Sequence, residues 1–270
     1  MLIPVIIVGG IGLVCSVVLV IAAKVMALPA DELFDKVRAE LPGANCGACG
    51  YAGCDDYAKA VAHSGAKTNL CVPGGATCAA AVSAAMGVAA EEVEEKYAVV
   101  RCSGSCQSTP PAVGYEGVPS CAACSTLYHG KGSCYYGCMG FGDCVAACQY
   151  GAISIVDGVA MVDKSACVGC GMCAKACPNH LIAIIPKSST VFVGCSSHDK
   201  GAVTRKVCQS GCIGCKKCEK TCEFGAITVT DNLAAIDPAK CTGCGSCVTA
   251  CPTGAITTCV SRCETVGKSA

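Results

Sequence analysis

Residues 151–178 read GAISIVDGVAMVDKSACVGCGMCAKACP, and residues 225–252 read GAITVTDNLAAIDPAKCTGCGSCVTACP. The second stretch repeats the first at an offset of 74 positions, which also relates Cys148 to Cys222. A repeat of this kind indicates two copies of one structural unit. In each copy a short alternating apolar segment precedes a turn, Asp157-Gly158 or Asp231-Asn232, and this pattern predicts a β-hairpin.

The cysteines of both copies have the spacing of iron–sulfur ligands. Three runs read C-x2-C-x2-C-x3-C and begin at Cys167, Cys212 and Cys241, while a wider run begins at Cys134. Most two-residue gaps hold a glycine, which lets the backbone turn tightly and point amide groups at the sulfurs. This is the run of bacterial ferredoxins, in which three thiolates bind one [4Fe–4S] cluster and the fourth binds its neighbour.

The ferredoxin rule therefore predicts two clusters, with crossed ligands, in each copy. The predicted ligands of the first copy are Cys134, Cys138, Cys144 with Cys177, and Cys167, Cys170, Cys173 with Cys148; those of the second are Cys212, Cys215, Cys218 with Cys251, and Cys241, Cys244, Cys247 with Cys222. The run at Cys134 departs from the standard pattern, because it reads C-x3-C-x5-C-x3-C. Gln149 and Glu223 replace the usual proline.

A further four-cysteine set lies upstream of the repeat. The stretch LPGANCGACGYAGC (residues 41–54) is followed by Cys71, and the predicted ligands of one more cluster are Cys46, Cys49, Cys54 and Cys71. Apolar residues between Asp31 and Leu41 recur at helical spacing, so a small helical domain is expected here. Four cysteines also suit tetrahedral zinc, which is the alternative.

Six other cysteines could form a sixth site, either a cluster or a zinc ion. They are Cys102, Cys106, Cys121, Cys124, Cys195 and Cys208. Local spacing favours the first four together, and a set that joins the last two to Cys102 and Cys121 is also open. The alternative is that these thiols bind no metal. Cys259 and Cys263, near the end of the chain, are expected to be free.

Composition favours metal over disulfides. The chain has 30 cysteines among 270 residues, a level that in a short secreted protein would suggest a disulfide scaffold. Here the cysteines lie close together in short runs, where neighbouring thiols are poorly placed to form disulfides with distant partners. This arrangement indicates metal binding in a reducing cytosol. Large core residues are few, with no Trp and four Phe, so the clusters are expected to organise the fold. Twenty basic and twenty acidic residues balance, so no nucleic-acid partner is expected.

The N-terminal residues 2–23 carry no charged side chain and predict a single transmembrane helix. A helix of this length extends about 33 Å, enough to span the hydrocarbon core. A cleaved signal peptide is the alternative, but it would have a positively charged start and a shorter apolar core. Lys24, Lys36 and Arg38 follow the span and place the cysteine-rich part in the cytoplasm by the positive-inside rule.

These features predict an α+β protein: a transmembrane helix, a small helical four-cysteine domain and two tandem bacterial-type 2[4Fe–4S] ferredoxin modules. The predicted segments are an anchor at 1–28, a four-cysteine domain at 29–98, a cysteine-containing connector at 99–130, the first ferredoxin module at 131–187, an inserted strand segment at 188–207, the second module at 208–258 and a tail at 259–270.

The succession of an apolar span, LPGANCGACGYAGC and duplicated ferredoxin modules resembles the B subunit of the Rnf complex, a membrane ferredoxin:NAD oxidoreductase, over essentially the whole chain. The resemblance implies an electron-transfer subunit of a redox-driven ion pump in the bacterial cytoplasmic membrane. It also implies that the chain takes electrons from reduced ferredoxin and passes them to flavin-carrying and integral-membrane subunits that reduce NAD. Because the chain has no G-x-G-x-x-G strand-to-helix unit, no nicotinamide site is expected in it. No acid–base pair or nucleophile constellation stands out, so no bond-making catalytic residue is expected either.

Two alternative functions stay open at this point. One is a membrane-tethered electron donor to another reductase, such as a system that reduces a redox-sensing transcription factor. The other is a zinc-stabilised scaffold. A ferredoxin-docking surface is expected in the basic segment 200–222, which includes Lys216 and Lys217, because soluble ferredoxins are generally acidic. The alternative for this segment is a solvated face or a contact with a partner subunit.

Overall fold

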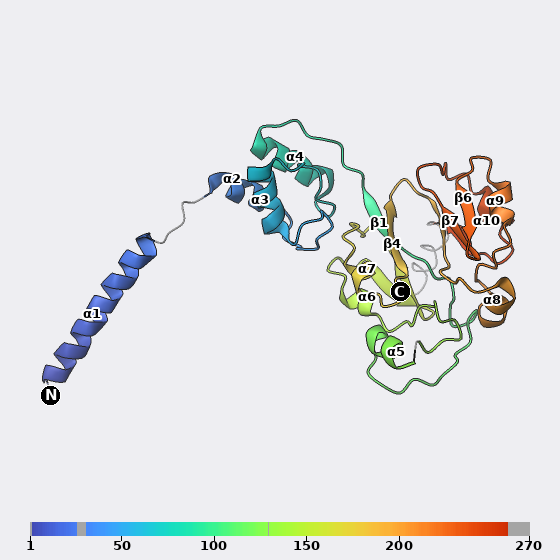
Figure 1. Cartoon of the computed structure of the whole chain (residues 1–270), viewed down its shortest axis with the longest axis horizontal. Helices are drawn as coiled ribbons and strands as arrows, with labels where there is room; N and C mark the ends of the chain where they lie inside the picture. Colours follow the sequence, from blue (N-terminus) through green and yellow to red (C-terminus); the bar gives the residue numbers. More distant parts are fainter. Residues whose placement is uncertain (1, 26–30, 129, 259–270) are drawn as a thin grey trace.

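The computed structural model describes residues 2–25, 31–128 and 130–258 (Figure 1). The predicted tail at 259–270, with Cys259 and Cys263, lies outside the described residues. The chain begins with helix α1 (Leu2–Val25). Within α1 the described side chains are those of residues 9–22, and its large apolar side chains from Ile11 to Ile21 are exposed. Over the described part of the chain, no helix has both the length and the apolar character that crossing a membrane requires.

Helices α2 (Glu32–Ala39), α3 (Cys54–Ser64) and α4 (Gly75–Met86) form the small helical domain. The Asp31 carboxylate begins α2 by accepting a hydrogen bond from the amide of Phe34, at 3.1 Å. Helix α2 packs against both α3 and α4, and Val37, Tyr57 and Val82 are buried between them. The helical domain expected from the apolar spacing is therefore present.

The first repeat is built on two antiparallel strand pairs. The strands are β1 (Lys96–Val100), β2 (Ile153–Val156), β3 (Val159–Val162) and β4 (Ile182–Pro186), and the helices are α5 (Cys121–Tyr128), α6 (Asp143–Ala146) and α7 (Met172–Ala176). β2 and β3 form the predicted hairpin, with Asp157 and Gly158 both at positive φ in its turn. β4 pairs with β1 along its whole length, from Val100 opposite Ile182 to Lys96 opposite Pro186.

The second repeat has the same plan. Its strands are β5 (Val191–Val193), β6 (Ile227–Thr230), β7 (Leu233–Ile236) and β8 (Ile256–Thr258), and its helices are α8 (Gly201–Val207), α9 (Lys217–Thr221) and α10 (Ser246–Ala250). β6 and β7 form the second predicted hairpin, and β5, which lies in the expected strand segment at 188–207, pairs with β8. Each module thus consists of a hairpin and a second strand pair that closes it.

This pairing differs from the segment boundaries expected from the sequence. β1 runs across the expected boundary at residue 98, yet it completes the first module by pairing with β4. The reason is that β1 needs a partner strand of matching length, and the sequence near residue 98 does not indicate which later segment is that partner. Each module therefore begins with a strand, β1 or β5, that an inserted segment separates from its cysteine run.

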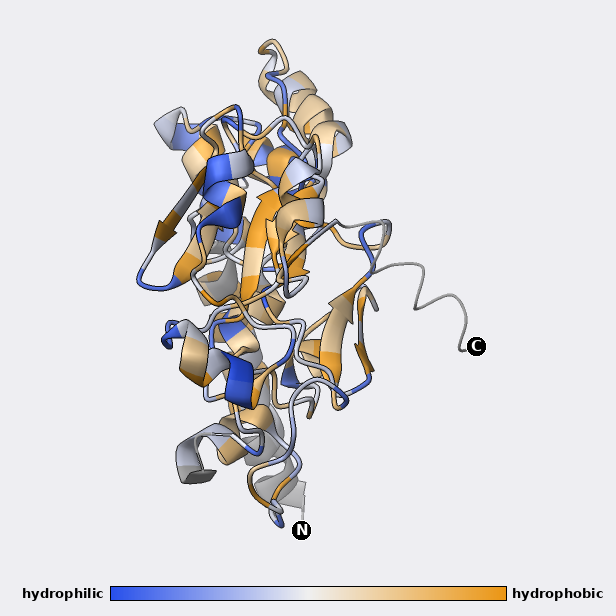
Figure 2. Ribbon diagram, turned by 90° about the vertical axis from the view of Figure 1, so that its right-hand side faces the viewer, coloured by the Kyte–Doolittle hydropathy of each residue, from blue (hydrophilic) through white to orange (hydrophobic). Residues whose placement is uncertain are grey.

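Each module has its own core, and cysteines are part of it. Cys144, Cys167 and Cys173 are buried in the first, together with residues of β1 to β4. In the second, buried cysteines lie among residues of β5 to β8. Figure 2 shows that hydrophobic residues concentrate in the strands, while the short helices carry more hydrophilic ones. The chain has few large side chains, with no Trp and four Phe, so buried cysteines occupy part of the space that larger side chains fill in a conventional core.

Candidate metal centres

The second module brings together the four cysteines that the crossed rule predicts for its first cluster. A cavity of about 330 Å³ is lined by Cys212, Cys215, Cys218 and Cys251. Burial and the neighbouring thiolates of the other three raise the pKa of Cys218 to about 11. Cys251 comes from the end of α10, and the other three from the loop that leads into α9 and from α9 itself. The cavity between the sulfurs is the space that a cluster would fill.

The cysteines of the other predicted set of this module interact electrostatically. Burial, and then the thiolates of Cys241, Cys244 and Cys222, raise the pKa of Cys247. Cys222 is the residue at which α9 ends, so the chain carries it away from Cys218 and toward the second site. The crossed set stays a prediction, and α9 (Lys217–Thr221), which carries Cys218 near its start and is followed by Cys222, is the element that would separate the two ligands.

One site of the first module follows the same geometry. Burial raises the pKa of Cys173 to about 11, with contributions from the thiolates of Cys167, Cys170 and Cys148. The Cys167 sulfur accepts a hydrogen bond from the amide of Ala98, at 3.4 Å. Amide-to-sulfur bonds of this kind are typical of thiolate ligands to clusters. Because Ala98 lies on β1, the strand closes the module and also contributes to its metal site.

The remaining site of the first module differs by one residue from the predicted set. A cavity of about 400 Å³ is lined by Cys138, Cys144 and Cys177, and its fourth cysteine is Cys121. Cys134, predicted from spacing alone, instead lines a separate cavity. Cys121 is the first residue of α5, and the Asp143 carboxylate holds that helix end. It accepts hydrogen bonds from the amides of Cys121 and Ala122 at 2.9 and 3.0 Å.

The separate cavity, of about 460 Å³, lies where the inserted segments of the two modules meet. Its cysteines include Cys134 together with Cys102, Cys195 and Cys208, three of the six left over in the sequence. Burial raises the pKa of Cys134 to about 11, and the thiolates of Cys208 and Cys195 add to the effect. Of the other leftover cysteines, Cys106 is exposed, and Cys124 is packed in an apolar cluster with Cys121 and Met139.

The small helical domain holds the upstream set of four cysteines. Cys46 and Cys71 are buried and Cys49 and Cys54 are half-buried. Burial raises the pKa of Cys49, as do the thiolates of Cys46 and Cys71. The sequence pattern gave no sign of one neighbour, Cys78 on α4, which is buried and donates from its thiol to the Glu40 carbonyl at 3.2 Å.

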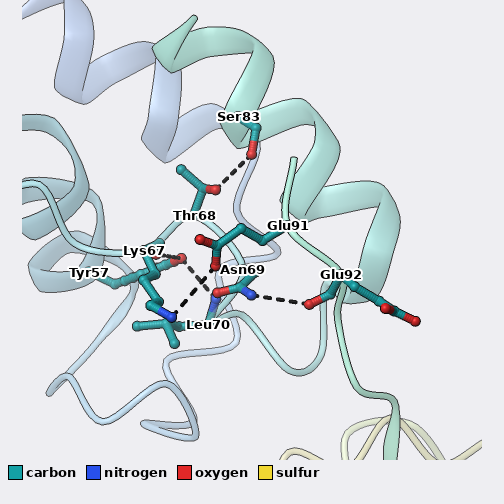
Figure 3. A network of polar contacts seen from close by, with 8 residues as sticks. All are labelled: Tyr57, Lys67, Thr68, Asn69, Leu70, Ser83, Glu91 and Glu92. Atoms are coloured by element: carbon teal, nitrogen blue, oxygen red, sulfur yellow. Dashed lines mark hydrogen bonds and ion pairs between the residues drawn. The ribbon is translucent and has the colours of Figure 1, made fainter. Parts of the chain in front are cut away.

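A polar network holds the segment that leads to Cys71 (Figure 3). The Tyr57 hydroxyl donates to the Lys67 carbonyl at 2.8 Å and accepts from the Leu70 amide at 3.2 Å. The hydroxyls of Thr68 and Ser83 are 2.7 Å apart, which ties the same segment to α4. The backbone directly before Cys71 is thus bonded to two helices, so its position is determined by tertiary contacts.

Thiols of two of the five predicted sites line one cavity each: Cys212, Cys215, Cys218 and Cys251 in the second module, and Cys138, Cys144 and Cys177, joined by Cys121, in the first. The other three sets stay predictions. Among the described residues, no three side chains of the His, Cys, Asp or Glu type lie close enough together to share a single metal ion. All cysteines in the described part of the chain are free thiols.

A fold of repeated hairpins around convergent cysteines defines a multi-cluster iron–sulfur protein of the ferredoxin class. Comparison with protein families agrees. Residues 41–73 match a family described as "Putative Fe-S cluster", residues 160–183 match a 4Fe-4S binding domain, and residues 211–255 match a 4Fe-4S dicluster domain.

Similarity to individual proteins extends over most of the chain. It is 44% identical to the B subunit of the Na(+)-translocating ferredoxin:NAD(+) oxidoreductase complex of Acetobacterium woodii, over 87% of this chain and 71% of that protein. It is 46% identical to the B subunit of the ion-translocating oxidoreductase complex of Methanosarcina acetivorans, over 86% of this chain and 88% of that protein. A proton-translocating counterpart in Clostridium ljungdahlii is 40% identical, over 84% and 81%. The chain belongs to the family of B subunits of ion-translocating oxidoreductase complexes.

Proposed function

We propose that this chain is the electron-transfer subunit of an ion-translocating ferredoxin:NAD oxidoreductase complex. It takes electrons from reduced ferredoxin and relays them to partner subunits that reduce NAD. The observation that carries this function is that four cysteines line one cavity in each ferredoxin module: Cys121, Cys138, Cys144 and Cys177 in the first, and Cys212, Cys215, Cys218 and Cys251 in the second. The three relatives at 40–46% identity are B subunits of ion-translocating oxidoreductase complexes, and two of those complexes are named as ferredoxin:NAD(+) oxidoreductases.

The residues present fit at least five [4Fe–4S] clusters. All-thiolate clusters of this type exchange single electrons, and burial and hydrogen bonds to sulfur tune their potentials. This chain supplies both the burial and the hydrogen bonds to sulfur. The sulfur of Cys177 accepts from the Leu181 amide at 3.4 Å, as that of Cys167 does from Ala98. Gly169, at φ +70, lies against the Lys96 carbonyl, where a Cβ would come within 2.5 Å, so the loop between ligands has room only for glycine.

The proposed ligands are the predicted sets, with Cys121 in place of Cys134. They are Cys46, Cys49, Cys54 and Cys71 upstream; Cys121, Cys138, Cys144 and Cys177, and Cys148, Cys167, Cys170 and Cys173 in the first module; and Cys212, Cys215, Cys218 and Cys251, and Cys222, Cys241, Cys244 and Cys247 in the second. The role of the chain is to hold these clusters in sequence and to shield them from water. No bond-making step is assigned to it.

Two neighbouring sites belong to different domains, which supports a continuous relay. Burial raises the pKa of Cys170 in the first module, and the thiolate of Cys46 in the helical domain contributes. Tyr150 lies at the same junction, where burial and the thiolates of Cys170 and Cys46 raise its pKa. The Lys175 ammonium of the first module donates to the Cys46 carbonyl of the helical domain at 2.7 Å, so the two domains are in direct contact, and the proposal is that electrons pass between them without a diffusing carrier.

A membrane anchor at α1 is also part of the proposal; the uncharged run of residues 2–23 carries this step, because the described side chains of α1 are only those of residues 9–22. The 24-residue helix extends about 36 Å at 1.5 Å per residue, against about 30 Å of hydrocarbon. Exposed Leu13, Val14 and Leu19 have no protein core to cover them. The cysteine-rich part then lies on the cytoplasmic side, where Lys36 and Arg38 follow the helix. Val14→Arg with Val17→Arg should release the protein from membranes, since each arginine at the bilayer centre costs about 3 kcal/mol on insertion scales.

Metal analysis and reduction kinetics test the function. Anaerobically purified protein should carry at least about twenty iron and twenty sulfide per chain, because five sites hold four irons each. Reduced ferredoxin should bleach its visible absorption, and the partner subunits should reoxidise it. Stoichiometric zinc with little iron would contradict the proposal, as would full iron content with no reduction by ferredoxin.

A further inference from the structure

The two inserted segments contain cysteines at equivalent places. Cys102 lies two residues after Val100, the end of β1, and Cys195 lies two residues after Val193, the end of β5. The repeat offset of 74 relates Cys134 to Cys208. Each module therefore contributes one cysteine just after its first strand and one just before its cysteine run. None of these four is needed by the five sites proposed above.

The tertiary structure brings these four cysteines to one cavity. Cys102, Cys134, Cys195 and Cys208 all line the space of about 460 Å³ between the modules. A Cβ added to Gly104 would stand 3.4 Å from the Cys208 sulfur and 3.6 Å from the Cys102 sulfur. Two sulfurs from different modules thus face the same point. The same Cβ would meet the Thr109 hydroxyl at 2.6 Å, so only glycine fits there.

Hydrogen bonds to sulfur at this cavity follow the repeat as well. The amide of Cys138 donates to the Cys102 sulfur at 3.4 Å, and the amide of Cys212 donates to the Cys195 sulfur at 3.3 Å. Cys138 and Cys212 are themselves equivalent by the offset of 74. The Cys195 sulfur also accepts from the Ser197 amide at 3.4 Å. Such donors stabilise thiolates that bind iron.

A polar group also faces the cavity without a partner. Among the described residues, the Thr109 hydroxyl is buried with no hydrogen-bond partner, and Thr109 lines this cavity. Burying a hydroxyl without a partner is unfavourable, because its hydrogen bonds to water are lost and not replaced. A sulfide or a thiolate of a bound cluster would be an acceptor for it.

The repeat also explains why Cys134 is free for this site. The offset of 74 relates Cys215, a ligand in the second module, to Phe141 in the first. The first module thus lacks the middle cysteine of its run, and Cys121, held at the start of α5, lines that cavity instead. In the second module Cys208 likewise stays outside the ferredoxin sites.

We infer that Cys102, Cys134, Cys195 and Cys208 bind a sixth [4Fe–4S] cluster between the two modules, and that Cys121 replaces Cys134 in the first module. This inference rests on the proposed function, because it extends the same relay. The cluster takes two ligands from each inserted segment. Its amide donors belong to Cys138 and Cys212, which are ligands of one site in each module. The sixth cluster is therefore the direct electron path from one module to the other.

Pairs of serine variants in the full-length chain test the ligand assignment by iron content. Cys134→Ser and Cys195→Ser should each remove about four of about twenty-four irons, and the double variant should remove the same four. Cys134→Ser with Cys177→Ser should remove about eight, because the two residues serve different clusters. Cys121→Ser with Cys177→Ser should again remove only about four. Cys106→Ser, an exposed cysteine of the same segment, is the matched control and should retain all of them.

The opposite pattern would overturn the inference. If Cys134→Ser with Cys177→Ser removes only about four irons, Cys134 belongs to the first module as its spacing suggests. If Cys195→Ser with Cys208→Ser leaves the iron content unchanged, or removes one zinc ion instead, no sixth cluster exists. The electron paramagnetic resonance signals of the remaining clusters report whether each variant is folded. A wild-type protein with no iron would refute the proposed function itself, which is a different outcome from loss of the sixth cluster alone.

Discussion

The Lys175 ammonium on α7 donates a hydrogen bond to the carbonyl oxygen of Cys46 at 2.7 Å, although the two residues are 129 positions apart. Lys175 lies between Cys173 and Cys177 of the first module, and Cys46 is a proposed ligand in the helical domain. The same ammonium lies 3.3 Å from the point where a Cβ on Gly47 would stand. This bond joins the cysteine loops of two domains, so it would set how the proposed clusters of these domains face each other.

Replacing Lys175 should therefore slow electron transfer between the helical domain and the first module. A hydrogen bond at a partly exposed site contributes about 1 kcal/mol, so Lys175→Met should lower the docked fraction about fivefold. Iron content should not change, because Lys175 binds no cluster. Rapid-mixing absorption measurements would follow the internal step, and Lys59→Met, an exposed lysine on α3, is the control. An unchanged internal rate would show that this bond does not hold the two domains together.

The Asp143 carboxylate should control how firmly the first module holds Cys121. Partial burial raises the pKa of Asp143, but the amides of Ala122 and Cys121 and the Ser120 hydroxyl together hold it below its usual value. The carboxylate therefore stays charged near neutral pH. Asp143→Ala should cost about 1 kcal/mol at the start of α5 and speed the loss of one cluster's iron to a chelator. Asp56→Ala, in the first turn of α3, should not. Equal chelation rates in the two variants would argue against Cys121 as a ligand.

Cys222→Ala should damage the cluster of Cys241, Cys244 and Cys247, although Cys222 is close to Cys218 in sequence. The reason is that Cys222 ends α9 and contributes to the environment of Cys247. Cys251→Ala should show the reverse, with loss at Cys212, Cys215 and Cys218. Spectra of the two variants, compared signal by signal, would reveal the crossing. Loss in Cys222→Ala confined to the Cys218 cluster would mean that the ligands are not crossed.

Exposed lysines next to one cluster predict where ferredoxin docks. Lys216 and Lys217 lie between Cys215 and Cys218, both are exposed, and Lys216 lines the cavity of that site. Opposite charges mainly raise the association rate, and salt screens them over about 8–10 Å. Lys216→Glu with Lys217→Glu should slow reduction by ferredoxin about tenfold or more at low salt and flatten its salt dependence. Reduction by dithionite should stay nearly unchanged.

A charge reversal elsewhere is the control for that experiment. Lys59→Glu changes the net charge by the same amount as either of the two substitutions, but Lys59 lies on α3 in the helical domain. If Lys59→Glu slows the reaction and the double variant does not, electrons enter through the helical domain instead of the second module.

Much of this protein was predictable from the sequence because its determinants are local. Both hairpins follow from alternating apolar residues and turn residues that accept positive φ, such as Asp157 and Asp231. The crossed sets of the second module also follow from spacing. A short helix between the third and fourth cysteines, such as α9, separates Cys218 from Cys222 whatever surrounds it.

The repeat, the hairpins and the grouping of thiols within a few residues of one another were therefore encoded locally. The choice between Cys121 and Cys134, and the approach of Cys195 to Cys102, depended on tertiary packing. The 74-residue offset, which relates Cys134 to Cys208 and Phe141 to Cys215, was the one sequence signal that pointed to this exchange. The physical reason is that β1 and β5 pair with strands far along the chain, and those pairings set where each inserted segment begins. The spacing between cysteines predicts which of them share a site only when few residues separate them. Where the separation is longer, the packing of the two modules decides which cysteine reaches the site.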